Sequence, residues 1–206
     1  MFAKPAPIEL LASNRYYDKR FEREVIKVLP GEYFVTSGEI TLVTALGSCV
    51  AACIRDRKSG MGGMNHFMVG SDEQGGSSLS PVHFAAYGSY VMKVLISDLL
   101  KQGARRANLE AKIFGGGSAS VQQPASLAGQ RNADFLMGFL RKERLPVIAR
   151  DVLGNYPRKV YFFPDSGRVL VKKMMRQHND TLVRRERAYA ARLNQTPLAG
   201  ETYCFT

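Results

Sequence analysis

Short apolar segments cluster in pairs along this chain, and this pairing constrains the fold more than any other feature of the sequence. Residues 39–56 and 64–69 flank a turn sequence at 57–60, and residues 159–163 and 169–173 flank the sequence Pro-Asp-Ser-Gly. Paired segments of this kind predict β-hairpins, whereas a doubly wound sheet would alternate strands with helices. We therefore predict the α+β class: a single-domain sandwich of mixed or antiparallel sheet with packed helices.

Two segments between these pairs have the periodicity of amphipathic helices. The first begins at Ser80-Pro81, where serine suits the N-cap and proline the first helical position, and Gly103 is placed to end it. The second lies near residues 131–143. The residues expected on the buried faces are Tyr87, Val91, Val94 and Leu95 in the first helix, and Phe135, Leu136, Phe139 and Leu140 in the second.

The chain is strongly basic, with 29 Lys and Arg against 18 Asp and Glu and a net charge of +11. Residues 172–192 hold seven of the basic and two of the acidic residues, so much of the excess lies near the C-terminus. The helical spacing of Leu182, Tyr189 and Leu193 favours a solvated amphipathic helix, although a basic tail could also bind nucleic acid or an acidic partner. No recognition helix, zinc-finger spacing or RNP-like motif accompanies the charge, so no nucleic acid is expected among the partners.

Cysteine usage and hydropathy exclude several classes of protein. Three cysteines, with Cys49 and Cys53 four positions apart, argue against a disulfide framework, and with only three histidines a structural zinc site is not expected. No apolar run approaches the roughly 18 residues of a membrane span, and the first residues lack a secretory core. We expect a cytoplasmic protein.

One stretch of the sequence carries the residues of a thiol–imidazole pair. If residues 50–56 and 59–69 form a hairpin that turns at Arg57-Lys58, Cys49 lies directly opposite His66, with Cβ atoms about 5 Å apart. A longer turn would shift this register. An adjacent imidazole can take the thiol proton, stabilise the thiolate and later protonate a leaving amine. Gly47-Ser48 would permit a tight turn that exposes the sulfur and aims backbone N–H groups at an oxyanion.

The alternatives for these residues are structural. A cysteine in an apolar segment is commonly a small buried hydrophobe, and Cys53, which lacks the preceding Gly-Ser, is expected to pack in the core. The Gly115–Gly117 run is not followed by the Gly-Lys-Ser/Thr of a phosphate loop. These glycines are expected to let the backbone turn closely beside another element.

The order and spacing of several motifs resemble the CheD family, the chemoreceptor glutamine deamidases of bacterial chemotaxis. The seventeen residues from cysteine to histidine are part of this match. The motifs are LPGEYFVT (29–36), LGSC (46–49), GGMNHFM (62–68), AYG (86–88), KIFGGG (112–117), GQRNADF (129–135) and PRKVYFFPDSGRVLVKK (157–173).

The resemblance implies an enzyme that hydrolyses selected glutamine side chains of methyl-accepting chemotaxis receptors to glutamate and ammonia, without metal or cofactor. It implies Cys49 as the nucleophile and His66 as the base and acid. A threonine upstream supports the histidine in the family; we assign it to Thr44, acting through its backbone carbonyl, with Val43 as the alternative position. The implied fold resembles the catalytic domain of the cytotoxic necrotizing factor toxins.

The resemblance also implies how the chain divides into domains and how a receptor substrate reaches the site. Residues 1–28 form an N-terminal extension, 29–175 the CheD-like deamidase domain, and 176–206 a basic C-terminal helix and tail. Because the substrate glutamine lies on a long receptor helix, we expect a shallow, open site, with access through the Gly/Ser-rich stretch at 70–80.

Other functions of the same residues remain open. The dyad could act as a transglutaminase if an amine replaced water. A non-enzymatic chemotaxis module is the alternative from another class, acting through receptors or through a CheC-like phosphatase, which CheD relatives bind where that protein exists.

Overall fold

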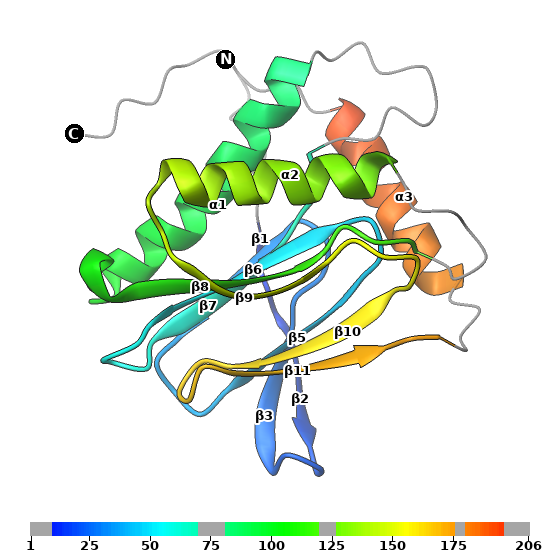
Figure 1. Ribbon diagram of the computed structural model, residues 1–206. Helices are drawn as coiled ribbons and strands as arrows, with labels where there is room; N and C mark the ends of the chain where they lie inside the picture. Colours follow the sequence, from blue (N-terminus) through cyan, green and yellow to red (C-terminus); the bar gives the residue numbers. More distant parts are fainter. Residues whose placement is uncertain (1–9, 70–80, 120–126, 176–179, 196–206) are drawn as a thin grey trace, which may run out of the picture.

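The computed structural model describes residues 10–69, 81–119, 127–175 and 180–195, which form two stacked sheets and three α-helices (Figure 1). The six-stranded sheet has the order β1-β4-β7-β6-β8-β9, and the five-stranded sheet has the order β11-β10-β5-β3-β2. The strands of the first sheet are β1 (Leu10–Leu11), β4 (Glu32–Thr36), β7 (Gly62–His66), β6 (Val50–Asp56), β8 (Leu109–Gly115) and β9 (Val147–Val152). Those of the second are β11 (Arg168–Lys173), β10 (Arg158–Phe163), β5 (Thr41–Leu46), β3 (Arg23–Lys27) and β2 (Asn14–Asp18).

The helices cover one face and one end of this sandwich. Helices α1 (Pro81–Lys101) and α2 (Leu127–Lys142) pack on the six-stranded sheet, and a short 3-10 turn (Arg106–Asn108) precedes β8. Helix α3 (Asp180–Gln195) lies at one end of the sheets (Figure 1). Apolar side chains between the layers form one main core, which includes Leu42 of β5, Ile54 of β6 and Leu95 of α1. None of the described helices is both long and apolar enough to cross a membrane.

Most of the predicted elements are confirmed. Parallel and antiparallel pairs occur in both sheets, β10 and β11 form the predicted hairpin, and Gly103 follows α1 with a φ of +108°. The predicted buried faces are also found, except that Val94 and Phe135 are only partly buried. The predicted loop at 70–80 and the predicted N-cap lie outside the described residues. Strands β1, β2 and β3 come from the segment expected to be an N-terminal extension, and they join both sheets.

The predicted register of the hairpin between β6 and β7 is wrong by two residues. The loop spans residues 57–60, because Asp56 N–H donates to the carbonyl of Met61, and the strands pair Cys53 with Met64. The carboxylate of Asp56 stabilises this longer loop by accepting the N–H groups of Lys58 and Ser59. A shift of two residues keeps every side chain on the same face of the sheet, so Cys49 and His66 are diagonal rather than opposite neighbours.

Replacement of Asp56 by asparagine should destabilise the fold. The carboxylate also accepts Arg105 N–H at 2.7 Å; burial alone would raise its pKa, but these hydrogen bonds outweigh burial and lower it to about 2. Such bonds to a charged acceptor are each worth about 1.5–3 kcal/mol, so we expect Asp56→Asn to cost about 2–3 kcal/mol at neutral pH. The stabilisation is fully present above the unfolded pKa near 3.8 and is lost as the pH falls through about 2.

Urea denaturation of the wild type and of Asp56→Asn, at neutral pH and near pH 3, checks this prediction. The difference in the free energy of unfolding should shrink in acid. A constant difference at both pH values would show that the charge of Asp56 is not responsible.

Candidate active site

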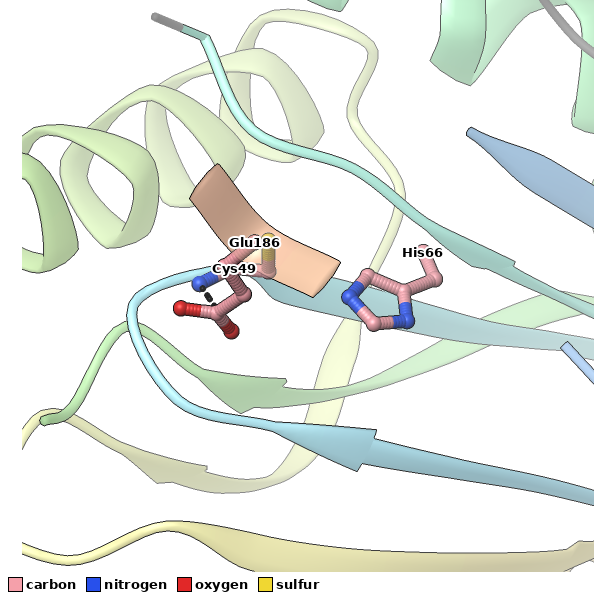
Figure 2. Close-up of side chains that lie close together, drawn as sticks. All are labelled: Cys49, His66 and Glu186. Carbon is pink, nitrogen blue, oxygen red and sulfur yellow. Dashed lines mark hydrogen bonds between the residues drawn. The ribbon is translucent and has the colours of Figure 1, made fainter. Parts of the chain in front are cut away.

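The predicted cysteine and histidine meet beside a residue that the sequence did not single out. Cys49 lies directly before β6, His66 ends β7, and Glu186 comes from α3 (Figure 2). The sulfur of Cys49, a ring nitrogen of His66 and a carboxylate oxygen of Glu186 all lie within 4.8 Å of one another. Three distant parts of the chain therefore supply one buried cluster of a nucleophile, a base and an acid.

The orientation of His66 follows from its contact with β5. The hydroxyl of Thr44 donates to the carbonyl of Val28 at 2.7 Å, and its oxygen lies 2.7 Å from Nδ1 of His66. Because the hydroxyl proton is directed to the carbonyl, the hydroxyl oxygen accepts the proton of Nδ1, and Nε2 carries the lone pair. Nε2 is buried and has no hydrogen-bond partner among the described residues. The ring presents this nitrogen toward Cys49 and Glu186 (Figure 2).

The role assigned to Thr44 is therefore corrected in one respect, because its side-chain hydroxyl, not its backbone carbonyl, contacts the histidine. Val43, the alternative position, packs in a separate cluster with Val25 and Tyr161.

The loop before β6 presents a nest of N–H groups to Glu186. The N–H groups of Gly47, Ser48 and Cys49 donate to its carboxylate at 2.8, 3.0 and 3.3 Å, and the hydroxyl of Ser48 donates at 2.7 Å. Successive N–H groups that converge in this way form an anion-binding site. The prediction that Gly47-Ser48 would aim N–H groups at an oxyanion is consistent with this geometry. The prediction that the turn would expose the sulfur is wrong, because Cys49 is buried.

The carbonyl groups of the same loop are all held by the protein. Those of Gly47 and Cys49 accept N–H groups of Gly117 and Gly116, each at 2.8 Å, and that of Ser48 accepts Nδ2 of Asn132, also at 2.8 Å. Because these hydrogen bonds fix the carbonyl groups of residues 47–49, the N–H groups of the same loop are held in position as well. Such preorganisation is what an oxyanion site needs.

The glycine run has the structural role that the sequence predicts. Gly115 has a φ of +104°, and a Cβ added to it would lie 2.2 Å from the carbonyl oxygen of Cys49. Only glycine allows β8 to approach the loop of the cysteine this closely. Cys53, expected to pack, is buried in the core.

Burial and Glu186 together hold the pair in its neutral form. Burial first, and then the charge and hydrogen bond of Glu186, raise the pKa of the Cys49 thiol well above its usual value. Burial lowers the pKa of His66 to about 3. Both residues are at most 1% exposed, so the expected shallow, open site is not what the structure has. Helix α3 covers it.

The same three groups could also hold a metal ion. Cysteine, histidine and glutamate are all ligands of Zn²⁺, and this is a group with suitable spacing among the described residues. The carboxylate of Glu186 is also engaged by hydrogen bonds from the N–H groups of Gly47 and Ser48.

Sequence reasoning missed Glu186, although a signal was present. Residues 182, 186, 189 and 193 share one helix face, and Leu182, Tyr189 and Leu193 are buried as predicted. An acidic residue on the apolar face of a basic helix is unusual, and Glu186 is 5% exposed. The position of Glu186 on the apolar face was therefore the sequence signal for a functional residue.

Comparisons with known proteins agree with the motifs. The family model described as CheD chemotactic sensory transduction matches residues 71–173. The "Probable chemoreceptor glutamine deamidase CheD 1" of Dechloromonas aromatica (strain RCB) is 55% identical over 96% of this chain and 96% of its own. Proteins named "Probable chemoreceptor glutamine deamidase CheD" from Thiobacillus denitrificans and Methylobacillus flagellatus are 54% and 52% identical, each over 96% of this chain and 97% of their own. A solved structure, Bacillus licheniformis hypothetical protein YfiH, covers 60% of this chain and 51% of its own at 12% identity; its TM-score of 0.36 is too low to bear on the fold.

Proposed function

The chain belongs to the CheD family, and from this premise we propose that it is a protein-glutamine deamidase. Its substrates are selected glutamine side chains of methyl-accepting chemotaxis receptors, which it converts to glutamate with release of ammonia. The observation that carries the proposal is the unpaired Nε2 of His66 beside the sulfur of Cys49, next to the N–H nest of residues 47–49.

The mechanism uses each of these groups in turn. His66 Nε2 takes the proton of Cys49, and the sulfur attacks the carboxamide carbon of the substrate glutamine. The N–H nest stabilises the negative oxygen of the tetrahedral intermediate. His66 then protonates the leaving nitrogen, so that ammonia departs and a thioester remains. Finally, His66 activates a water molecule that hydrolyses the thioester, which releases glutamate and restores the thiol.

Thr44 acts as a positioning residue because it holds the tautomer of His66. Replacement of Thr44 by valine should lower kcat about tenfold or more, since one buried hydrogen bond to the imidazole is lost and the ring can present the wrong nitrogen. Thr44→Ser keeps the hydroxyl and should restore most of the rate. Steady-state kinetics of both variants check this, and equal losses in both would show that the methyl group, not the hydroxyl, matters.

A basic cleft lined in part by Thr44 could help the enzyme to bind acidic stretches of a receptor. A cavity of about 390 Å³ runs from Thr44 to α3, and its lining includes Lys27, Lys159, Lys172 and Arg185 without an acidic residue among the described ones. Such a cleft attracts acidic stretches of a partner, and the attraction weakens with salt.

The experiment that tests the function uses a purified cytoplasmic fragment of a chemoreceptor. After incubation with the protein, peptide mass spectrometry should detect Gln→Glu conversion at particular positions, and less of it at high salt. An added primary amine should not be incorporated; incorporation would indicate a transglutaminase. Absence of any conversion on several receptors, by a folded protein, would contradict the proposal.

The covered site is the one observation that favours the alternative of a non-enzymatic module. In that case the protein acts in chemotaxis through receptors or a CheC-like phosphatase, and Cys49→Ala retains the physiological effect. The cytoplasmic location and the resemblance to the necrotizing factor catalytic domain remain predictions that accompany the proposed function.

A further inference from the structure

The carboxylate of Glu186 is bound as a ligand of the site would be. It is buried, it receives three N–H groups and one hydroxyl, and it lies beside the sulfur of Cys49 (Figure 2). A glutamate side chain is also the chemical product of glutamine deamidation. The Glu186 carboxylate on α3 therefore resembles the glutamate side chain that deamidation would leave on a receptor helix.

Side-chain contacts, rather than strand pairing, hold α3 in place. Helix α3 forms no backbone ladder with either sheet. Tyr189 packs on Gly31, where an added Cβ would lie 2.8 Å from its ring, and its hydroxyl hydrogen-bonds to that of Tyr87. Arg192 donates to the carbonyl of Pro30 at 3.3 Å. Among the described residues α3 contributes to neither sheet, so its departure would break no strand pairing there.

We infer that α3 is an internal product mimic: Glu186 fills the subsite of the substrate carboxamide, and α3 must withdraw before a glutamine-bearing helix of another protein can bind. This inference rests on the proposed function, because it identifies the nest with the substrate subsite. A carboxylate suits the role since it carries no leaving group for the thiol to displace.

Alkylation of Cys49 by iodoacetamide tests the covering role without reference to catalysis. Glu186→Ala removes the anchoring carboxylate and should accelerate alkylation about tenfold or more, because α3 withdraws more often and the buried sulfur becomes accessible. Cys53 is an internal control, because it is equally buried but does not contact Glu186, and its rate should not change. Arg187→Ala, an exposed substitution on the same helix, should leave both rates as in the wild type.

Glu186→Gln tests the product-mimic role directly, because it turns the internal ligand into a substrate. The Cys49 sulfur forms a bond to the carboxamide carbon of the new side chain, the C–N bond breaks and ammonia leaves with a proton from His66. Water then cleaves the thioester and restores the thiol. Mass spectrometry should show the Gln→Glu mass change at position 186 in this variant and none when Cys49→Ala is combined with it.

The results separate this inference from the proposed function. Unchanged Cys49 alkylation in Glu186→Ala, or equal acceleration at Cys49 and Cys53, would overturn the covering role. Conversion of receptor glutamines without conversion at position 186 would overturn the product-mimic role. Selective acceleration at Cys49 with no deamidation of either substrate would support a covering helix and refute the deamidase.

Discussion

Replacement of Cys49 by alanine is expected to abolish receptor deamidation, lowering the rate at least about ten-thousandfold. The sulfur forms the covalent bond of the intermediate, and Cys53, the other cysteine among the described residues, is buried in the core. The loss should lie in kcat, because the N–H nest and the surrounding surface are retained. Mass spectrometry of a receptor fragment, incubated with the variant at high enzyme concentration, measures it.

Cys53→Ala is the matched control for this prediction. Cys53 lies in β6 with a similar burial, but it packs in the core and does not reach His66. Its replacement should leave deamidation intact, apart from a modest loss of stability caused by the smaller side chain. Equal activity of Cys49→Ala and the wild type would disprove thioester catalysis at this site.

Sequence reasoning succeeded where the deciding interactions are local. The turns at Pro164–Gly167 and the helix end at Gly103 depend on neighbouring residues, and both lie where their turn residues indicate. The hairpin of β6 and β7 shows the limit. Its existence was predictable, but its register depends on the longer loop that Asp56 stabilises. Because that error was an even number of residues, Cys49 and His66 remain on the same face of the sheet, as diagonal neighbours.

The covering of the site could not be predicted in the same way. Glu186 and the loop of Gly47 are 139 positions apart in the sequence, and no local pattern indicates which helix face meets which loop. The spacing of Leu182, Tyr189 and Leu193 predicted an amphipathic helix and its buried face, but not the surface on which that face packs. Thr44 is an intermediate case: the family resemblance suggested the residue, whereas the atom that contacts His66 follows from the inward direction of its side chain in β5.

Replacement of His66 by glutamine should lower receptor deamidation about a thousandfold, more than any change at Thr44. The amide of glutamine can donate a hydrogen bond to the Thr44 hydroxyl as Nδ1 does, but glutamine can neither take the thiol proton nor return it to ammonia. Alkylation of Cys49 in the open Glu186→Ala background should slow as well, because the imidazole no longer stabilises the thiolate. Full deamidation by His66→Gln would exclude His66 as the general base.

The same variant should change how stability depends on pH. Burial lowers the pKa of His66 in the folded protein to about 3, below the ordinary value of 6.5, so the unfolded chain binds a proton more readily in between. Wild-type stability should therefore fall as the pH decreases from about 6.5 toward 3, and His66→Gln should lack this contribution. Urea denaturation across that range measures it. Parallel curves for the two proteins would mean that His66 is not held neutral by its burial, and the base assigned to the mechanism would lose its support.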